Sequence, residues 1–366
     1  MSSRVRRSTV MLSIVALVGI GAALVPTAAG AVAVGDEAAF RLAWENAATT
    51  QVDLTADITL TCPDGASDRN SATPITLDGN GFSITQSCAS QRVLGATGGG
   101  AVELRNLTIT GGSAPGDAGG GLYADTPLTI TNSTFSGNSS DNGGALYATG
   151  TTTITSSTFR DNSAVAGFGN GGAIQIASTG SLTVINSTIS NNTATNAGGG
   201  ITTAGAPVTL VYATVVDNTG SSGANLEMGG SGDSKGTLTS FGSVVALPRG
   251  GGTNCAEVTT SSDGYNVSDD ASCGFTAGTD LQGSGDPGLG QLAANGGPTQ
   301  TRLPGAGSPL LDRIPASACQ SGVAVGIAQD QRGLTRPGAA GCDVGSVEVQ
   351  PPPPADPAVV TPTFTG

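Results

Sequence analysis

The chain has 366 residues, a net charge of −13, 58 glycines and no histidine. Its acidic balance argues against nucleic acid and anionic lipid as partners, because like charges repel. The absence of histidine removes most of the zinc sites that proteins use. Glycine and the plentiful serine, threonine and asparagine are poor helix formers, so the composition predicts an all-β protein.

Residues 1–33 are predicted to be a secretory signal peptide. Three arginines precede an apolar run over residues 10–25, and small residues then offer cleavage sites after Ala31 or Ala33. The apolar run is shorter than the roughly 20 residues that span a bilayer, which disfavours the alternative of a retained anchor. We therefore expect an extracellular or cell-envelope protein with no membrane span in the mature chain.

A short amphipathic helix is predicted next, within residues 34–50. Phe40, Ala43, Trp44 and Ala47 fall on one face of a helix drawn over residues 36–50. We expect this helix to cover the first coil of the repeats that follow, because an open solenoid end exposes strand edges and apolar core.

Residues 51–275 consist of tandem repeats. Leu122 begins a series of equivalent positions that recur every 24 to 28 residues, and each repeat holds three short apolar pieces separated by Gly, Asn and Ser turns. The equivalent positions are Leu122, Leu146, Ile174, Ile201 and Leu226. Three strands per repeat and a constant period predict a right-handed parallel β-helix of roughly nine or ten coils.

Stacked coils place equivalent side chains in continuous ranks. The inward rank is expected to contain Phe135, Phe159 and Ile189. One turn position holds Asn138, Asn162, Asn192 and Asn218, where asparagine tolerates a left-handed backbone and its amide can bond along the stack. A weaker rank at another turn contains Asn132, Ser156 and Asn186. Five glycines precede the third strand, where either a positive φ or a close backbone approach is expected to exclude a side chain: Gly119, Gly143, Gly171, Gly198 and Gly223.

Six cysteines form three neighbouring pairs in a chain predicted to be exported. We expect the disulfides Cys62–Cys88, Cys255–Cys273 and Cys319–Cys342, although fifteen connectivities are formally possible. Local pairing is preferred because each pair brackets one coil or cap. No pair has the spacing of metal ligands.

Two resemblances point to bacterial surface proteins. F-x-x-N at Phe135 and Phe159, with G-G-A-[IL] at Gly143 and Gly171, resembles the polymorphic outer membrane protein repeat of surface-exposed adhesins, over roughly residues 100 to 230. A second resemblance is to the choice-of-anchor Q domain. The segments that resemble it are GYNVSDDASC from Gly264 and, after it, DPGLGQLAANGGPTQ and DQRGLTRPGAAGCDVGSVE. These resemblances imply a β-helix surface protein, with a C-terminal cap region over residues 276–349. Residues 350–366 are predicted to form an extended Pro-rich tail.

The sequence predicts no catalytic residues and no cofactor. Acids in the registered coils occupy scattered repeat positions, whereas polysaccharide cleavage needs converging carboxylates. Asp263, Asp269 and Asp270 are weak calcium candidates whose alternative interpretation is a solvated turn. Arg332 and Arg336 could act as an arginine base, but salt bridges to Asp330 or Asp343 are favoured.

Outward threonines form a further rank on one flat face, at Thr129, Thr153, Thr183 and Thr209. A second rank begins with Thr131 and Thr155 and is interrupted by Ile185 and Val211. Such ranks can bind carbohydrate or ice, or can be ordinary solvent-facing strand residues. The function predicted is a secreted or cell-surface, monomeric and non-catalytic β-helix protein for adhesion or for binding carbohydrate or envelope. The alternative is a polysaccharide lyase or glycoside hydrolase on the same scaffold.

Overall fold

The structure is a computed structural model that describes residues 30–62, 64–165, 167–229 and 235–351. Nearly all of the predicted signal peptide and of the Pro-rich tail therefore lies outside the described residues. In the described part, no helix is long and apolar enough to cross a membrane.

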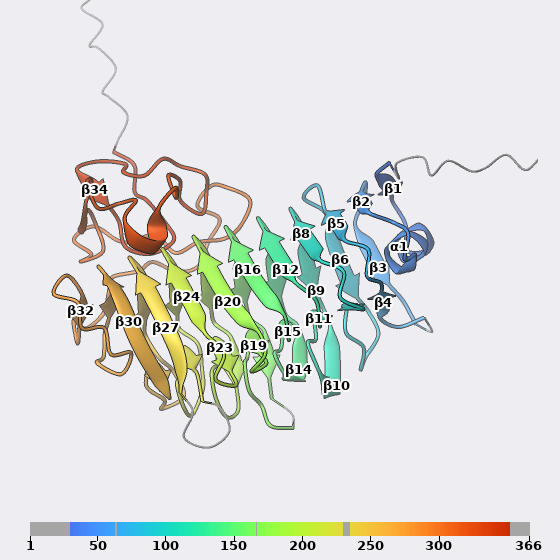
Figure 1. The fold of residues 1–366 in the computed structure, drawn as a ribbon, viewed down its shortest axis with the longest axis horizontal. Coiled ribbons are helices and arrows are strands. Elements are labelled where there is room, and N and C mark those ends of the chain that lie inside the picture. Colours follow the sequence, from blue (N-terminus) through green and yellow to red (C-terminus); the bar gives the residue numbers. More distant parts are fainter. Residues whose placement is uncertain (1–29, 63, 166, 230–234, 352–366) are drawn as a thin grey trace, which may run out of the picture.

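The chain folds as a parallel β-solenoid with three long sheets, which confirms the predicted fold class (Figure 1). The first sheet contains β1 (Val32–Val34), β2 (Gln51–Leu54), β5 (Ile75–Asp78), β8 (Val102–Arg105), β12 (Leu128–Thr131), β16 (Thr151–Thr155), β20 (Ser181–Ile185), β24 (Val208–Val211), β27 (Gly236–Phe241) and β30 (Val258–Gly264). The second sheet contains β3 (Ile58–Leu60), β6 (Ser83–Gln86), β9 (Thr108–Thr110), β13 (Thr134–Ser136), β17 (Thr158–Arg160), β21 (Thr188–Ser190), β25 (Thr214–Val216), β28 (Val244–Ala246), β31 (Val267–Ser268) and β32 (Leu281–Gln282).

The third sheet completes each turn of the solenoid. It contains β4 (Ser67–Asn70), β7 (Leu94–Thr97), β11 (Leu122–Ala124), β15 (Leu146–Ala148), β19 (Ile174–Ile176), β23 (Ile201–Thr203), β26 (Leu226–Glu227) and β29 (Cys255–Ala256). Its eight strands give eight complete turns, with partial turns at both ends, so the expected nine or ten coils slightly overstated the count. A small fourth sheet forms between the second and third sheets, with one strand from each of four successive coils. It contains β10 (Ser113–Ala118), β14 (Ser139–Asn142), β18 (Ser163–Ala164) and β22 (Thr193–Ala194).

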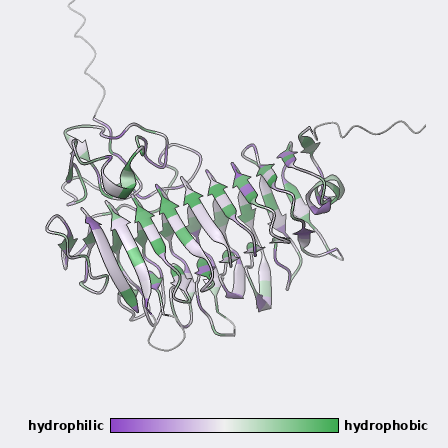
Figure 2. Cartoon of the chain, viewed as in Figure 1, coloured by the Kyte–Doolittle hydropathy of each residue, from purple (hydrophilic) through white to green (hydrophobic). Residues whose placement is uncertain are grey.

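Alternation of apolar and polar residues along each strand builds the interior (Figure 2). Phe135, Phe159 and Ile189 lie in register on β13, β17 and β21, and all three are fully buried. The Phe135 and Phe159 rings stack with centroids 4.7 Å apart and planes 3° apart. The inward rank predicted from the repeat is therefore one shared column of side chains.

The Asn138 rank forms a buried hydrogen-bonded ladder inside the solenoid. Nδ2 of Asn138 donates to Oδ1 of Asn162 at 3.0 Å, Asn162 donates to Asn192 at 2.9 Å, and Asn192 donates to Asn218 at 3.0 Å. Asn225 and Asn254, which the repeat alignment did not place in this rank, continue the ladder.

The backbone conformation expected for this ladder was wrong. The left-handed residue is the one before each asparagine: Gly137, Asp161, Asn191 and Asp217, with φ of 63°, 55°, 61° and 58°. The asparagines themselves turn inward, because a buried amide can satisfy two neighbouring coils at once. The weaker rank of Asn132, Ser156 and Asn186 does have positive φ, of 50°, 50° and 45°.

The N-terminal end is covered by α1 (Glu37–Glu45), which packs on the first coil. Asp36 caps the helix by accepting a hydrogen bond from the backbone of Ala39. Phe40, Ala43 and Trp44 are buried as predicted, and Trp44 Nε1 donates to the carbonyl of Ser67. Ala47, by contrast, is exposed beyond the end of the helix, because the chain leaves the helix at Asn46.

The three disulfides join Cys62 to Cys88, Cys255 to Cys273, and Cys319 to Cys342, the pairs expected from their order in the chain. Near the second pair, Phe275 and Cys273 are buried against the last coil and close the far end of the core.

The C-terminal segment, defined as residues 285–351, does not cover that end. It turns back and packs along the side of the solenoid, over the later strands of the first and second sheets (Figure 1). Within it lie β33 (Ile314–Pro315), β34 (Gly341–Cys342) and a 3₁₀ turn, η1 (Gly322–Ala324). The cap region predicted over residues 276–349 is therefore mostly a lateral cover. The apolar outward residues Val211, Phe241 and Val244 pack against Leu310, Ile314 and Val344 of the segment, which explains its position.

Candidate functional site

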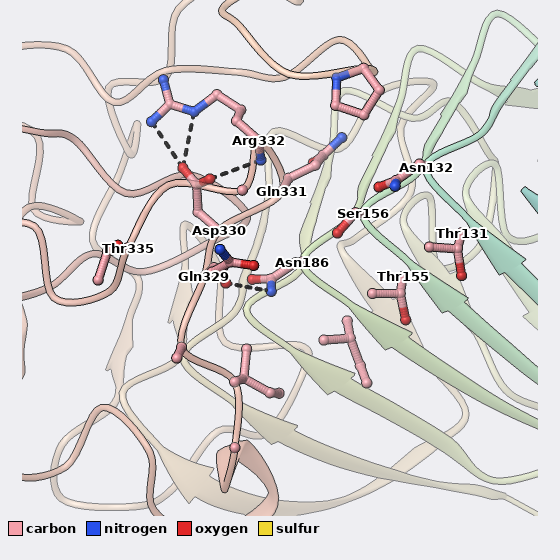
Figure 3. Close-up of a pocket in the computed structure, with 16 residues that line it drawn as sticks. Thr131, Asn132, Thr155, Ser156, Asn186, Gln329, Asp330, Gln331, Arg332 and Thr335 are labelled. Carbon is pink, nitrogen blue, oxygen red and sulfur yellow. Dashed lines mark hydrogen bonds and ion pairs between the residues drawn. The ribbon is translucent and has the colours of Figure 1, made fainter. Parts of the chain in front are cut away.

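A groove of about 740 Å³ runs between the first sheet and the C-terminal segment. The solenoid side comes from the ends of β12, β16 and β20 and the turns that follow them. The opposite side comes from residues 326–335 and Pro298. Figure 3 shows the labelled solenoid side chains on one side and those of the C-terminal segment on the other.

The solenoid wall presents hydroxyl and amide groups in coil register. Thr131 pairs with Thr155 across adjacent strands, and Asn132 and Ser156 occupy the turns just after them. Within the described residues, the hydroxyls of Thr131, Thr155 and Ser156 make no side-chain hydrogen bond, and Asn132 makes only a long one, of 3.4 Å, to Asn106. These groups are therefore free to bind a polar ligand.

The opposite wall is fixed to the solenoid by buried hydrogen bonds. Asn186 Nδ2 donates to the carbonyl of Gln329 at 2.7 Å. Gln331, only 1% exposed, accepts from Thr188 and donates to Thr158 and Thr299. Because these polar groups satisfy one another, the segment holds one position against the coils and the groove has a defined width.

Within the described part of the chain, Asp330 is the single acidic residue lining the groove, and its carboxylate is fully hydrogen-bonded. Its oxygens accept hydrogen bonds from the backbone of Arg332, Leu334 and Glu348 and from the Arg332 side chain. The side chain has no exposed area. General acid–base catalysis needs a carboxyl within reach of the substrate, and this one lies behind the groove as a structural anchor.

The two arginines of this segment both form ion pairs. Arg332 pairs with Asp330 at 2.9 Å, one of the predicted partners. Arg336 instead pairs with Glu348 at 2.8 Å and donates to the carbonyl, not the carboxylate, of Asp343. Complete burial lowers the pKa of Arg336, and its guanidinium lies 4.1 Å from the centre of the Tyr212 ring. Neither arginine pairs with the carboxylate of Asp343, the other predicted partner, because that carboxylate accepts hydrogen bonds from the backbone of Asp312 and Val349.

Two acids of the coils, Asp161 and Asp217, are also held by partners of opposite charge. Asp217 is buried between Arg249 and Arg302, and Asp161 pairs with its neighbour Arg160. Although Asp161 and Asp217 share a repeat position, Asn191 separates them along the stack, and no carboxylate pair forms there.

The three calcium candidates do not make one site. Asp269 accepts from the backbone of Leu247 and the amide of Asn254, and Asp270 accepts from Asn254 and Ser272. Asp263 lies exposed on β30, near Gly322. In the part of the chain that the structure describes, no three Cys, Asp or Glu side chains gather as metal ligands would. Burial raises the pKa of Asp270, but the hydrogen bonds from Ser272 and Asn254 outweigh it and leave the pKa lowered.

Sequence reasoning named several residues of the groove without predicting the groove itself. Thr131, Thr155 and the Asn132 rank were recognised as surface ranks, and Asp330 and Arg332 as an ion pair. The signal that was available is the interruption of the outward threonine rank by Ile185 and Val211, which mark the strands covered by the C-terminal segment.

The fold and the groove together define a β-solenoid with a groove lined mainly by polar side chains. Residues 31–141 match a family described as "Putative pectate lyase-like adhesive domain". This likeness and the solenoid support a surface adhesive β-helix protein. No curated protein and no solved structure matches the chain.

Proposed function

We propose that the protein is exported and acts as a non-catalytic adhesin that binds carbohydrate or another envelope component in the groove. The observation that carries this proposal is the contrast between the two walls' polar groups. Among the residues that the structure describes, the hydroxyls of Thr131, Thr155 and Ser156 have no hydrogen-bond partner, whereas the carboxylate of Asp330 accepts four hydrogen bonds. The described lining of this site can therefore bind hydroxyl groups but offers no available pair of acid and base.

The match of residues 31–141 to an adhesive domain supports the same function. The segments that resemble the choice-of-anchor Q domain supply the outer wall of the groove. We therefore infer that this C-terminal region serves the binding site, in addition to any role it has in surface display.

The test is binding of the mature chain to a glycan array and to envelope preparations, together with assays for lyase products and reducing sugar. The variant Thr155→Tyr fills the groove from the solenoid wall. Its matched control is Thr153→Tyr, two residues earlier on β16, where the side chain also points outward but does not line the groove. We expect at least a tenfold weaker binding for Thr155→Tyr alone. Equal binding by both variants, or turnover of any polymer, would contradict the proposal.

A further inference from the structure

A second surface feature lies on the third sheet, away from the groove. Its outward positions form one rank in coil register: Asp68 pairs with Gly95, Gly95 with Tyr123, Tyr123 with Tyr147, and Tyr147 with Gln175. Its side chains reach the surface, because Asp68 is exposed and Tyr123, Tyr147 and Gln175 are half-buried. Its composition differs from the Ser and Thr ranks elsewhere, because it contains two aromatic rings and a position with no side chain.

Gly95 leaves a gap in this rank. A pocket of about 320 Å³ occupies the gap, between Asp68 on one side and Tyr123 on the other, with Arg92, Thr97 and Asp117 around it. A Cβ atom at Gly95 would collide with Oδ1 of Asp68, which leans over the glycine. Gly95 does not have positive φ, so backbone conformation does not require glycine there. The missing side chain therefore leaves room for the Asp68 carboxylate and the pocket beside it, and is not required by a turn.

The tyrosine wall of the pocket is rigid. The Tyr123 and Tyr147 rings stack with centroids 5.5 Å apart and planes 5° apart, and the Arg92 guanidinium lies 5.0 Å from the centre of the Tyr123 ring. Arg92 also pairs with Asp117, which offsets its charge. Burial, followed by the neighbouring Tyr123, raises the pKa of Tyr147, so the Tyr147 phenol keeps its proton at neutral pH and can donate a hydrogen bond.

Several polar groups along this rank lack protein partners within the described residues. The Asp68 carboxylate is exposed and makes no hydrogen bond, and neither tyrosine hydroxyl makes one. Oε1 of Gln175 is buried without any partner, which is costly for an amide unless a ligand or water satisfies it. The rank thus combines two aromatic side chains with unpaired acceptors and donors, a combination of apolar surface and hydrogen-bonding groups that suits a sugar.

We infer that the rank from Asp68 to Gln175 is a binding strip for an uncharged glycan, with one sugar unit seated in the gap at Gly95. Two carboxylates, Asp68 and Asp117, face one guanidinium at the pocket, and the whole chain is acidic with a net charge of −13. An acidic polysaccharide would be repelled there, whereas a neutral one would not. The inference shares with the proposed function only the premise that the protein binds glycans. The strip and the groove lie on different sheets, so each site can be tested separately.

The test fills the gap without altering the fold. In Gly95→Ser the new side chain enters the pocket, and only the end of the flexible Asp68 side chain must move. The matched control is Gly278→Ser, where a Cβ meets nothing within 4 Å and φ is also not positive. Titration calorimetry would measure binding of uncharged β-linked glucose and N-acetylglucosamine oligomers, and of oligogalacturonate, to wild type and both variants. Circular dichroism checks that each variant is folded.

We expect wild type and Gly278→Ser to bind an uncharged oligomer with the same Kd, Gly95→Ser to bind it at least tenfold more weakly, and oligogalacturonate to bind none of them. Tyr123→Ala should reproduce the loss, because it removes one wall of the pocket. Unchanged binding in folded Gly95→Ser would overturn the strip, as would a wild type that binds only oligogalacturonate. Thr155→Tyr reports on the groove alone. If that variant loses binding while Gly95→Ser binds as tightly as wild type, the proposed function stands and this inference is refuted.

Discussion

The buried asparagine ladder gives the sharpest test of how the coils are held together. Asn192 lies in the middle of the ladder and is fully buried. Its Oδ1 accepts from the backbone N–H and the side-chain amide of Asn162, and its Nδ2 donates to Asn218 and to the carbonyls of Phe159 and Ser190. Substitution of Asn192 by Ala removes all five hydrogen bonds at once.

The cost follows from which groups are left without partners. The backbone N–H of Asn162 loses its acceptor and the carbonyl of Phe159 loses the amide donor, whereas Asn162 Nδ2 still donates to Phe135 and Asn218 Oδ1 still accepts from the backbone of residue 192. An unsatisfied buried group costs about 1–3 kcal/mol, so Asn192→Ala should lower the free energy of unfolding by about 4 kcal/mol.

Denaturant unfolding followed by circular dichroism measures this difference. The matched control is Asn196→Ala, because Asn196 donates to Asn170 of the preceding coil at 2.8 Å but is exposed to solvent. Water replaces that bond, so the control should change stability by about 0.5 kcal/mol or less. Equal losses for the two variants would refute the argument that burial gives the ladder its strength.

Three further predictions concern the core, the N-terminal cap and acid stability. Phe159→Ala should cost about 3–5 kcal/mol through the cavity it leaves in the inward rank, whereas Phe168→Ala, at a side chain that is 77% exposed, should cost little; thermal unfolding distinguishes them. Arg69 is 2% exposed and donates to the carbonyls of five residues around the end of α1, so Arg69→Met should loosen the cap and shift the fluorescence of Trp44, the single tryptophan, to the red, while Arg69→Lys restores only part of the loss. Trp44 fluorescence in Arg69→Met at the same emission wavelength as in wild type would contradict that role of Arg69. Because the pKa of Asp270 is lowered in the folded state, its contribution is complete above the unfolded pKa of about 3.9 and is lost as the pH falls through the folded pKa, so Asp270→Asn should flatten the fall in unfolding free energy below about pH 4. An identical pH profile in the variant would count against it.

The sequence was sufficient to predict the solenoid, because stacking makes a repeat visible as a pattern. Phe135, Phe159 and Ile189 had to share a column once their positions recurred at a constant interval. The order of the cysteines and the apolar face of residues 36–46 were likewise local features, so the disulfide pairs and the cap helix could be read from neighbouring residues.

The same local pattern could not distinguish two asparagine ranks that differ only in direction. Asn138 turns into the core and Asn132 lies at a left-handed turn on the surface, although both recur at the coil interval. The choice depends on whether the residue before the asparagine takes the positive φ, which is decided by the path of the whole coil.

By itself, the sequence determined the coil, its ranks and the residues at its N-terminal end, because these depend on contacts repeated at one fixed spacing. Only the tertiary structure decided where the C-terminal segment packs, since residues such as Thr188 and Gln331 are far apart in the chain and no period relates them. The packing of this segment on the solenoid covers the apolar outward residues and creates the groove. The candidate site is therefore a product of non-repeating contacts, which is why its residues could be named from the sequence and its shape could not.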